Sequence, residues 1–286
     1  MTKVIVFANQ KGGVAKTTTA IALAQSLALD GKKVLFFDLD PQENASNTLR
    51  LKQDVPNLYD LMTAPDGDTS VFDTCLQSVE GCKNITAIRG NIQLSAADLM
   101  FNRQGREFII KERLEAHKSK FDVVIMDTPP ALGVLMVNAL TSANTVVVPI
   151  SPDGYSLQGF YQLNENMRLI KKYSNPQLKI GGILVTRYMP NTIVSREIKE
   201  IAQEYAGMAG TKVYKSVIRQ TVLVSESISS QQGVVLFAPN STAAQDYRAF
   251  AREIKREELM KGGIEYGSEE SGLPTKHRRN VPDIER

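Results

Sequence analysis

The stretch Asn9-Gln10-Lys11-Gly12-Gly13-Val14-Ala15-Lys16-Thr17-Thr18-Thr19 lies between a short apolar run, 4–8, and a segment of helical periodicity, 18–29. The β-branched run is typical of a strand that is buried on both faces of a parallel sheet. A strand, a glycine-rich turn and a helix N-terminus in this order direct several backbone N–H groups and the positive end of a helix dipole to one point. The stretch therefore predicts a phosphate-binding loop.

Two side chains of this loop have the chemistry that a polyphosphate requires. Lys16 is expected to reach the β- and γ-phosphates, and the Thr17 hydroxyl to ligate Mg²⁺. Ala15 stands where the strict pattern G-x-x-x-x-G-K-[ST] has its second glycine. If this position requires a positive φ, the alanine costs about 1–2 kcal/mol. The alternative, an ordinary strand-to-helix turn, is disfavoured by two further motifs along the chain.

These motifs are apolar runs that end in carboxylates. The run 33–37 leads into Asp38 and Asp40, and the run 121–126 leads into Asp127. Ligands of an open parallel sheet gather at the carboxyl ends of its strands, so we expect these acids beside the phosphate loop. A carboxylate placed there reaches the Mg²⁺ shell, which is the role expected of Asp127.

Later segments continue the alternation of strands and helices. Apolar runs at 145–150 and 180–187 flank a helical pattern at 157–173. This order predicts an α/β fold with a doubly wound, mostly parallel sheet and helices on both faces. The pattern does not give the order of the strands in the sheet.

The segment Lys11-Gly12-Gly13-Val14-x-Lys16-Thr17-Thr18 resembles the deviant Walker A motif of the ParA/MinD family of P-loop ATPases, and the two acidic motifs agree with that family in order. The resemblance extends over about 2–255. It implies ATP and Mg²⁺ as cofactors, hydrolysis of ATP to ADP and phosphate, and a homodimer that forms with ATP. It also implies a nucleotide-binding loop made of Lys11, Gly12, Gly13, Val14, Ala15, Lys16, Thr17 and Thr18.

The resemblance assigns further roles around the nucleotide. Lys11 would reach the nucleotide of the partner protomer, Asp40 would hold the attacking water, and Asp38 would support Mg²⁺ through water. The catalytic set is then Lys11, Lys16 and Asp40, and the metal set is Thr17, Asp38 and Asp127. Thr128-Pro129-Pro130 resembles a loop that senses the γ-phosphate. Nearer the base, the resemblance places Thr186, Arg187, Ile218 and Arg219.

Within the family the chain resembles the Soj-like ParA proteins, which implies an ATPase of DNA partition. Expected partners are nonspecific double-stranded DNA and a ParB-type centromere-binding protein that stimulates slow hydrolysis, without a membrane. The expected location is the cytoplasm, on the nucleoid. Asn191 and Val222 stand where DNA-binding arginines are expected. The DNA contacts that we predict instead are Arg187, Arg196, Lys215 and Arg219, although basic residues in such positions are equally typical of a solvated surface.

Three other functions are weighed against partition. A MinD-like ATPase that positions a membrane or protein cargo needs an amphipathic C-terminal helix, which 273–279 lacks. An iron–sulfur carrier needs paired cysteines at a dimer interface, but Cys75 and Cys82 lie in a variable segment. A small-molecule ligase with a phosphate loop would leave Lys11 without a purpose.

Composition sets the remaining expectations. The 286 residues are 42% hydrophobic and 23% charged, which is typical of one large globular domain, and the net charge of +3 permits contact with an anionic surface without requiring it. Two cysteines indicate a reducing compartment, and we expect neither a signal peptide nor a membrane span. We expect an ATPase domain at 1–258, with a surface insertion of small helices at about 52–92, and a polar, disordered tail at 259–286. We also expect a short strand at 92–96, a charged helical segment at 98–118 and a surface position for His117.

Overall fold

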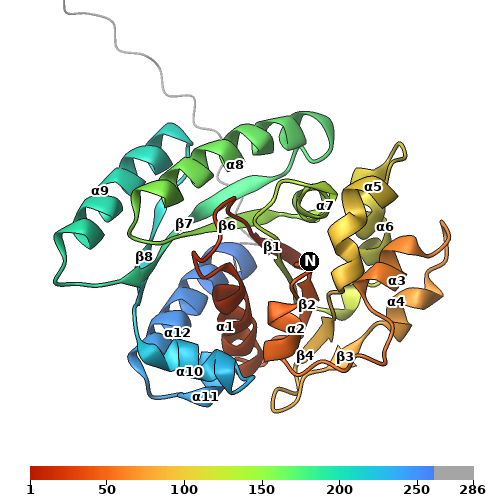
Figure 1. Ribbon diagram of the computed structural model, residues 1–286, viewed down its shortest axis with the longest axis horizontal. Helices are drawn as coiled ribbons and strands as arrows, with labels where there is room; N and C mark the ends of the chain where they lie inside the picture. Colours follow the sequence, from red (N-terminus) through yellow and green to blue (C-terminus); the bar gives the residue numbers. More distant parts are fainter. Residues whose placement is uncertain (261–286) are drawn as a thin grey trace, which may run out of the picture.

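The structure, a computed structural model, describes residues 1–260, so nearly all of the expected tail lies outside the described residues. Its centre is a sheet with the strand order β3-β4-β2-β5-β1-β6-β7-β8 (Figure 1). Neighbouring strands are parallel except for β3 and β4, so the predicted mostly parallel sheet is confirmed. The strands are β1 (Lys3–Phe7), β2 (Val34–Asp38), β3 (Gln77–Ser78), β4 (Ile85–Ile88), β5 (Val123–Asp127), β6 (Thr145–Ile150), β7 (Lys179–Tyr188) and β8 (Val213–Arg219).

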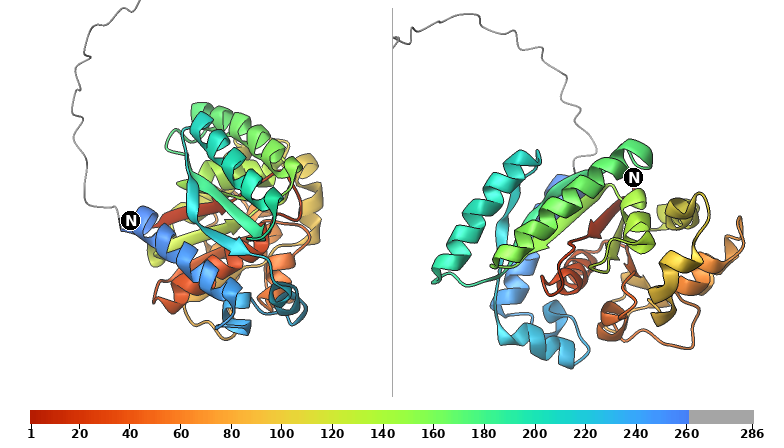
Figure 2. Two further views of the ribbon diagram at one scale, coloured as in Figure 1. Left: turned by 90° about the vertical axis from the view of Figure 1, so that its left-hand side faces the viewer. Right: turned by 45° about the horizontal axis from the view of Figure 1, so that its top comes forward.

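Helices cover both faces of the sheet, which lies between two helical layers in Figure 2. Successive side chains of a strand point to opposite faces. In β1, Ile5 and Phe7 accordingly pack with helices α1 (Lys16–Leu29), α11 (Val234–Phe237) and α12 (Thr242–Ile254). Val4 and Val6 pack on the other face with α7 (Val134–Ser142), α8 (Gly154–Tyr173) and α9 (Ile193–Met208).

The other helices are short. They are α2 (Asn44–Thr48), α3 (Leu58–Thr63), α4 (Ser70–Thr74), α5 (Ala97–Met100), α6 (Ile109–Glu115) and α10 (Val222–Ser229). There are also the 3₁₀ turns η1 (Ile92–Ala96), η2 (Arg106–Phe108) and η3 (Lys118–Lys120), and the π-helical turn η4 (Lys255–Leu259).

The segment 52–92 differs from the surface insertion that we expected. It contains the small helices α3 and α4, but it also supplies β4, which pairs with β2 and buries Ile85, Ala87 and Ile88. Strand β4 was not predicted because a run of four residues is too short for hydrophobic periodicity to distinguish a strand from a helix.

Phe72 of α4 is buried and stacks on His117, with ring centroids 4.2 Å apart. His117 is only 6% exposed, so the surface position expected for it is wrong.

Two local expectations nearby are also wrong. Residues 92–96 form the 3₁₀ turn η1 instead of a strand, because the Asn91 side chain accepts a hydrogen bond from the backbone N–H of Gln93 and caps a helical turn. The helical segment expected at 98–118 is divided among α5, η2, α6 and η3. Gly105, with φ of 81°, interrupts it, because a left-handed residue cannot continue a right-handed helix.

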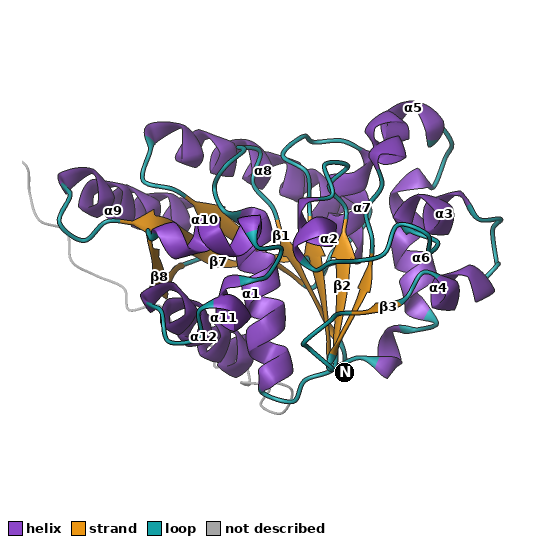
Figure 3. Cartoon of the chain, turned by 60° about the horizontal axis from the view of Figure 1, so that its bottom comes forward, coloured by secondary structure: helices purple, strands orange, loops and turns teal. Residues whose placement is uncertain are grey.

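The edge formed by the carboxyl ends of the parallel strands positions the candidate site. Asp127 of β5 is in register with Phe7 of β1 on one side and with Asp38 of β2 on the other. The phosphate loop follows Phe7, and Figure 3 shows the arrowhead of β2 beside α2 at this edge. The register therefore brings the loop and two of the predicted acids together.

Candidate nucleotide site

The predicted phosphate loop connects β1 to α1 and includes two left-handed residues. Gly13 has φ of 76° and Ala15 has φ of 61°. Ala15 is the N-cap of α1, and its carbonyl oxygen accepts hydrogen bonds from the Thr19 backbone N–H at 3.0 Å and the Thr19 hydroxyl at 2.6 Å. The position that has alanine instead of glycine is thus one that requires a positive φ. The first turn of α1 holds the alanine in this strained conformation.

We expect Ala15→Gly to raise the free energy of unfolding by about 1 kcal/mol, because glycine adopts the left-handed conformation without strain. The larger conformational entropy of glycine in the unfolded chain offsets only part of this gain. Urea denaturation of the nucleotide-free protein measures the change. The matched control is Ala116→Gly, an exposed residue with φ of −69°, which should lose stability by up to about 1 kcal/mol. Equal losses in the two variants would contradict the strain at Ala15.

Lys16 is the first residue of α1, and its side chain is folded over the loop. Its Nζ donates a hydrogen bond to the Lys11 carbonyl oxygen at 3.0 Å, and the residue is 7% exposed. Burial lowers the pKa of the Lys16 amine, while the charges of Asp127 and Asp40 act in the opposite direction. The ammonium group therefore lies between the loop and the acids of the strand ends.

Asp127 is a buried carboxylate without a hydrogen-bond partner. It is 0% exposed, and neither oxygen accepts a hydrogen bond from the described residues. Burial raises its pKa well above the usual range, and the charge of Asp38 adds to the rise. Thr17 and Lys16 lower the pKa, although the Thr17 hydroxyl does not reach hydrogen-bond geometry with the carboxylate. A buried unpaired carboxylate is costly, and a cation beside it removes that cost.

Asp38 and Asp40 differ in their surroundings. Asp38 is fully buried and accepts hydrogen bonds from the Ser46 N–H at 2.7 Å, the Ser46 hydroxyl at 2.6 Å and the Asp40 N–H at 3.1 Å. Burial nevertheless raises the pKa of Asp38 to about 6. Asp40 is 8% exposed, accepts a hydrogen bond from the Gln42 N–H at 3.0 Å and lines a cavity. Asp38 is thus enclosed in the protein interior, whereas Asp40 is accessible from the cavity.

These donors fit Mg²⁺ held together with phosphate oxygens. Residues 1–260 contain no group of three or more His, Cys, Asp or Glu side chains that could hold a metal ion alone. Mg²⁺ usually keeps several waters and takes one or two carboxylates in addition to substrate phosphates. The Asp127 carboxylate, which has no hydrogen-bond partner, and the nearby Thr17 hydroxyl are oxygen ligands that could hold Mg²⁺ together with phosphates.

A cavity of about 600 Å³ joins the phosphate loop to the ends of β7 and β8. Thr186, Arg187, Ile218 and Arg219, which we predicted near the base, line its far side. From the loop, the lining includes Gly12, Gly13, Ala15, Lys16, Thr17 and Thr18, together with Asp40. The volume and the residues suit one nucleotide.

Two predicted nucleotide residues are not among the lining residues. Val14 is buried, and its carbonyl oxygen accepts a hydrogen bond from the Thr186 hydroxyl at 3.1 Å. The Lys11 ammonium forms an ion pair with Asp153, which follows β6. Val14 therefore links the loop to β7, and Lys11 pairs with Asp153 instead of lining the cavity of its own protomer.

The cavity also includes residues that no motif indicated. Apart from one residue of α1, they come from α2, from the segment 220–234 that includes α10, and from α12, which are distant from the loop in sequence. Hydrophobic periodicity gives no sign that such segments share a wall with the loop. The missed lining residues are Ile21, Asn44, Thr48, Gln220, Thr221, Val224, Ser225, Ser227, Ile228, Gln232, Gly233, Val234 and Tyr247. Gln42 and Pro130, which belong to the two acidic motifs and the segments directly after them, line the cavity as well.

The predicted DNA contacts do not share one environment. Arg187, Arg196 and Lys215 are exposed, on β7, α9 and β8. The guanidinium group of Arg219 donates to both carboxylate oxygens of Asp246 in α12, at 2.9 and 2.7 Å. Three of the four side chains are thus exposed, although Arg187 also lines the cavity, and the fourth, Arg219, lines the cavity and is paired with Asp246 of α12.

Comparisons with known proteins extend these observations. An AAA domain family model matches residues 2–180. The chain is 38% identical over 257 residues to the sporulation initiation inhibitor protein Soj of Bacillus subtilis, covering 89% of this chain and 98% of Soj. It is 36% identical over 255 residues to the chromosome-partitioning ATPase Soj of Treponema pallidum, covering 89% and 97%.

A solved structure shares the fold. Cobyrinic acid a,c-diamide synthase from Mycobacterium smegmatis, with bound ADP and magnesium, is 31% identical with a TM-score of 0.75, and the match covers 90% of this chain and 95% of that one. In addition, no helix within residues 1–260 has the length and apolar character needed to cross a membrane.

Proposed function

Because the chain belongs to the ParA/MinD family of P-loop ATPases with a deviant Walker A motif, and is similar to its Soj members, we propose that it hydrolyses ATP in a cycle of DNA partition. The observation that carries the proposal is the buried, unpaired Asp127 carboxylate beside Lys16 and Thr17, two residues that line a cavity of nucleotide size. This arrangement favours Mg²⁺ and a polyphosphate.

The reaction is phosphoryl transfer from ATP to water, in which the bond from the γ-phosphorus to the bridging oxygen breaks and a bond to the water oxygen forms. Bound Mg²⁺ neutralises charge on the transferring group. Thr17 and Asp127 would hold the metal directly, and Asp38 through water. Lys16 would bind phosphate oxygens, and Asp40, on the cavity wall, would orient the attacking water.

We further propose that ATP joins two protomers and that Lys11 of each reaches the nucleotide of the other. The position of Lys11 supports this, because its ammonium pairs with Asp153 and is absent from the lining of its own cavity. Formation of the dimer would exchange the Asp153 carboxylate for phosphate oxygens. The free chain would then keep the Lys11 charge paired until a partner with bound ATP arrives.

The ATP dimer is proposed to bind nonspecific double-stranded DNA on the nucleoid, through Arg187, Arg196 and Lys215 of both protomers. Hydrolysis, stimulated by a ParB-type centromere-binding protein, would release it. Asn191 and Val222 still lack the charge expected at their positions, and Val222 is 72% exposed. The three exposed cations would therefore supply the phosphate contacts.

Retention on random-sequence duplex DNA tests this proposal. We expect the protein to bind this DNA only when ATP and Mg²⁺ are both present. If three cations from each protomer contact phosphates, the affinity for DNA should fall about 1,000-fold between about 50 and 200 mM salt. Lys215→Ala should reduce the dependence on salt, while protein with ADP or without nucleotide serves as the control. ATP-dependent dimers that do not bind DNA would contradict partition and favour a protein or membrane cargo, which liposome binding would then distinguish.

A further inference from the structure

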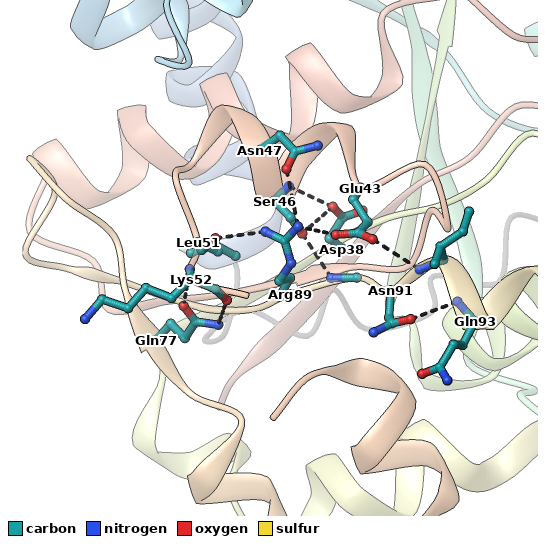
Figure 4. A network of polar contacts seen from close by, with 12 residues as sticks. Asp38, Glu43, Ser46, Asn47, Leu51, Lys52, Gln77, Arg89, Asn91 and Gln93 are labelled. Atoms are coloured by element: carbon teal, nitrogen blue, oxygen red, sulfur yellow. Dashed lines mark hydrogen bonds and ion pairs between the residues drawn. The ribbon is translucent and has the colours of Figure 1, made fainter. Parts of the chain in front are cut away.

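A buried polar network lies behind the Asp38 carboxylate, between the carboxyl end of β4 and α2 (Figure 4). Its centre is Arg89, the residue after β4, which is 5% exposed. The guanidinium group donates to the Leu51 carbonyl oxygen at 2.8 Å, to Asn47 Oδ1 at 3.3 Å and to the Glu43 carboxylate. One rigid, planar fork of donors thus holds three acceptors of the segment 43–51.

Glu43 connects this fork to the turn after Asp40. It has φ of 56°, a conformation that costs a residue with a side chain about 1–2 kcal/mol. Its backbone N–H donates to the Asp40 carbonyl oxygen at 2.9 Å, and its second carboxylate oxygen accepts from the Ile92 N–H at 3.1 Å. The ion pair with Arg89 therefore fixes both the strained turn and the start of α2.

Helix α2 also places Ser46 against the carboxylate of Asp38. The Ser46 N–H and hydroxyl both donate to Asp38 Oδ2, and the hydroxyl oxygen accepts from the Gly90 N–H at 3.0 Å. A Cβ atom on Gly90 would lie 3.0 Å from the Asp40 carbonyl oxygen and 3.1 Å from that of Asp38. The end of β4 therefore packs directly against the backbone that carries both acids.

We propose that Arg89 is a positioning residue for ATP hydrolysis. It holds α2 and the preceding turn, so that Ser46 orients the Asp38 carboxylate and Asp40 stays on the cavity wall. The inference rests on the proposed function. Because the three acceptors of Arg89 lie outside the phosphate loop, its loss acts on the catalytic step more than on nucleotide affinity.

Arg89→Lys tests this role, because lysine keeps the charge but cannot satisfy three acceptors as a fork. Steady-state ATPase assays should give a kcat about 10- to 100-fold below wild type, with KM for ATP within about 3-fold. Ser46→Ala removes the hydroxyl between Asp38 and Gly90 and should show the same split. Since both changes act on one carboxylate, the double variant should lose less than the product of the two single losses.

The matched control is Arg103→Lys. Arg103 also forms a double hydrogen bond with a carboxylate, that of Asp66, but on the exposed surface, so its replacement should leave kcat and KM unchanged. If the wild type hydrolyses ATP and both Arg89→Lys and Ser46→Ala keep its kcat, or change KM alone, the positioning role is overturned while the proposed function stands. A wild type that does not hydrolyse ATP overturns both.

Discussion

Lys16→Ala is expected to weaken ATP binding by about 100-fold and to abolish ATP-dependent dimerisation. The Lys16 ammonium is buried between the loop and two carboxylates, and hydrogen bonds that involve a charged group contribute about 1.5–3 kcal/mol each. Removing it leaves the negative charges of Asp127 and Asp40 without the positive charge of Lys16, so the site becomes repulsive to a polyphosphate. Titration with a fluorescent ATP analogue measures the affinity, and light scattering measures the dimer.

Lys33→Ala provides the comparison, because Lys33 is exposed and precedes β2 at the opposite end of the strand from Asp38. This variant should bind ATP as the wild type does. If Lys16→Ala still forms dimers with ATP at wild-type nucleotide concentrations, the ammonium group does not contact the phosphates.

Asp40→Ala is expected to separate binding from turnover. The Asp40 side chain lines the cavity without holding the phosphate loop, so nucleotide affinity should remain within about 3-fold, whereas the hydrolysis rate should fall about 100-fold or more. The variant should accumulate as an ATP-bound dimer. Phosphate release under single-turnover conditions gives the rate, and retention of ATP after gel filtration gives the occupancy.

Asp54→Ala, a change at an exposed acid outside the three motifs, is the matched control and should hydrolyse ATP normally. Wild-type hydrolysis by Asp40→Ala would remove the role of Asp40 in orienting water. Loss of ATP binding by the same variant would instead make Asp40 a binding residue, and the order of the catalytic cycle would have to change.

The positions of Lys16 and Asp40 were predictable because each follows from local order in the chain. An apolar run predicts a strand, and polar residues directly after several parallel strands must meet at one edge of the sheet. Thus Asp38 and Asp127, 89 positions apart in sequence, lie in register on neighbouring strands. Motif order alone was sufficient for this part of the site.

The sequence failed where a segment is short or where packing overrides local pattern. Strand β4 has four residues, and its only signal is a brief apolar run among loop residues. His117 reads as a surface residue because of its charged neighbours, yet α4 covers it with Phe72. Pairings of this kind depend on which elements meet, and one-dimensional periodicity does not contain that information.

The sequence by itself therefore predicted the α/β class, a phosphate loop with Ala15 in place of its second glycine, and the acids at the strand ends. The left-handed conformation of Ala15 became evident only in the structure. Only the tertiary structure decided how these groups are held. Arg89 joins segments 43–51 and β4, Arg219 is engaged by Asp246, Lys11 by Asp153, and α10 closes the cavity. The physical reason is range: a motif constrains neighbours along the chain, whereas a buried ion pair or a cavity wall forms between residues that only folding brings together.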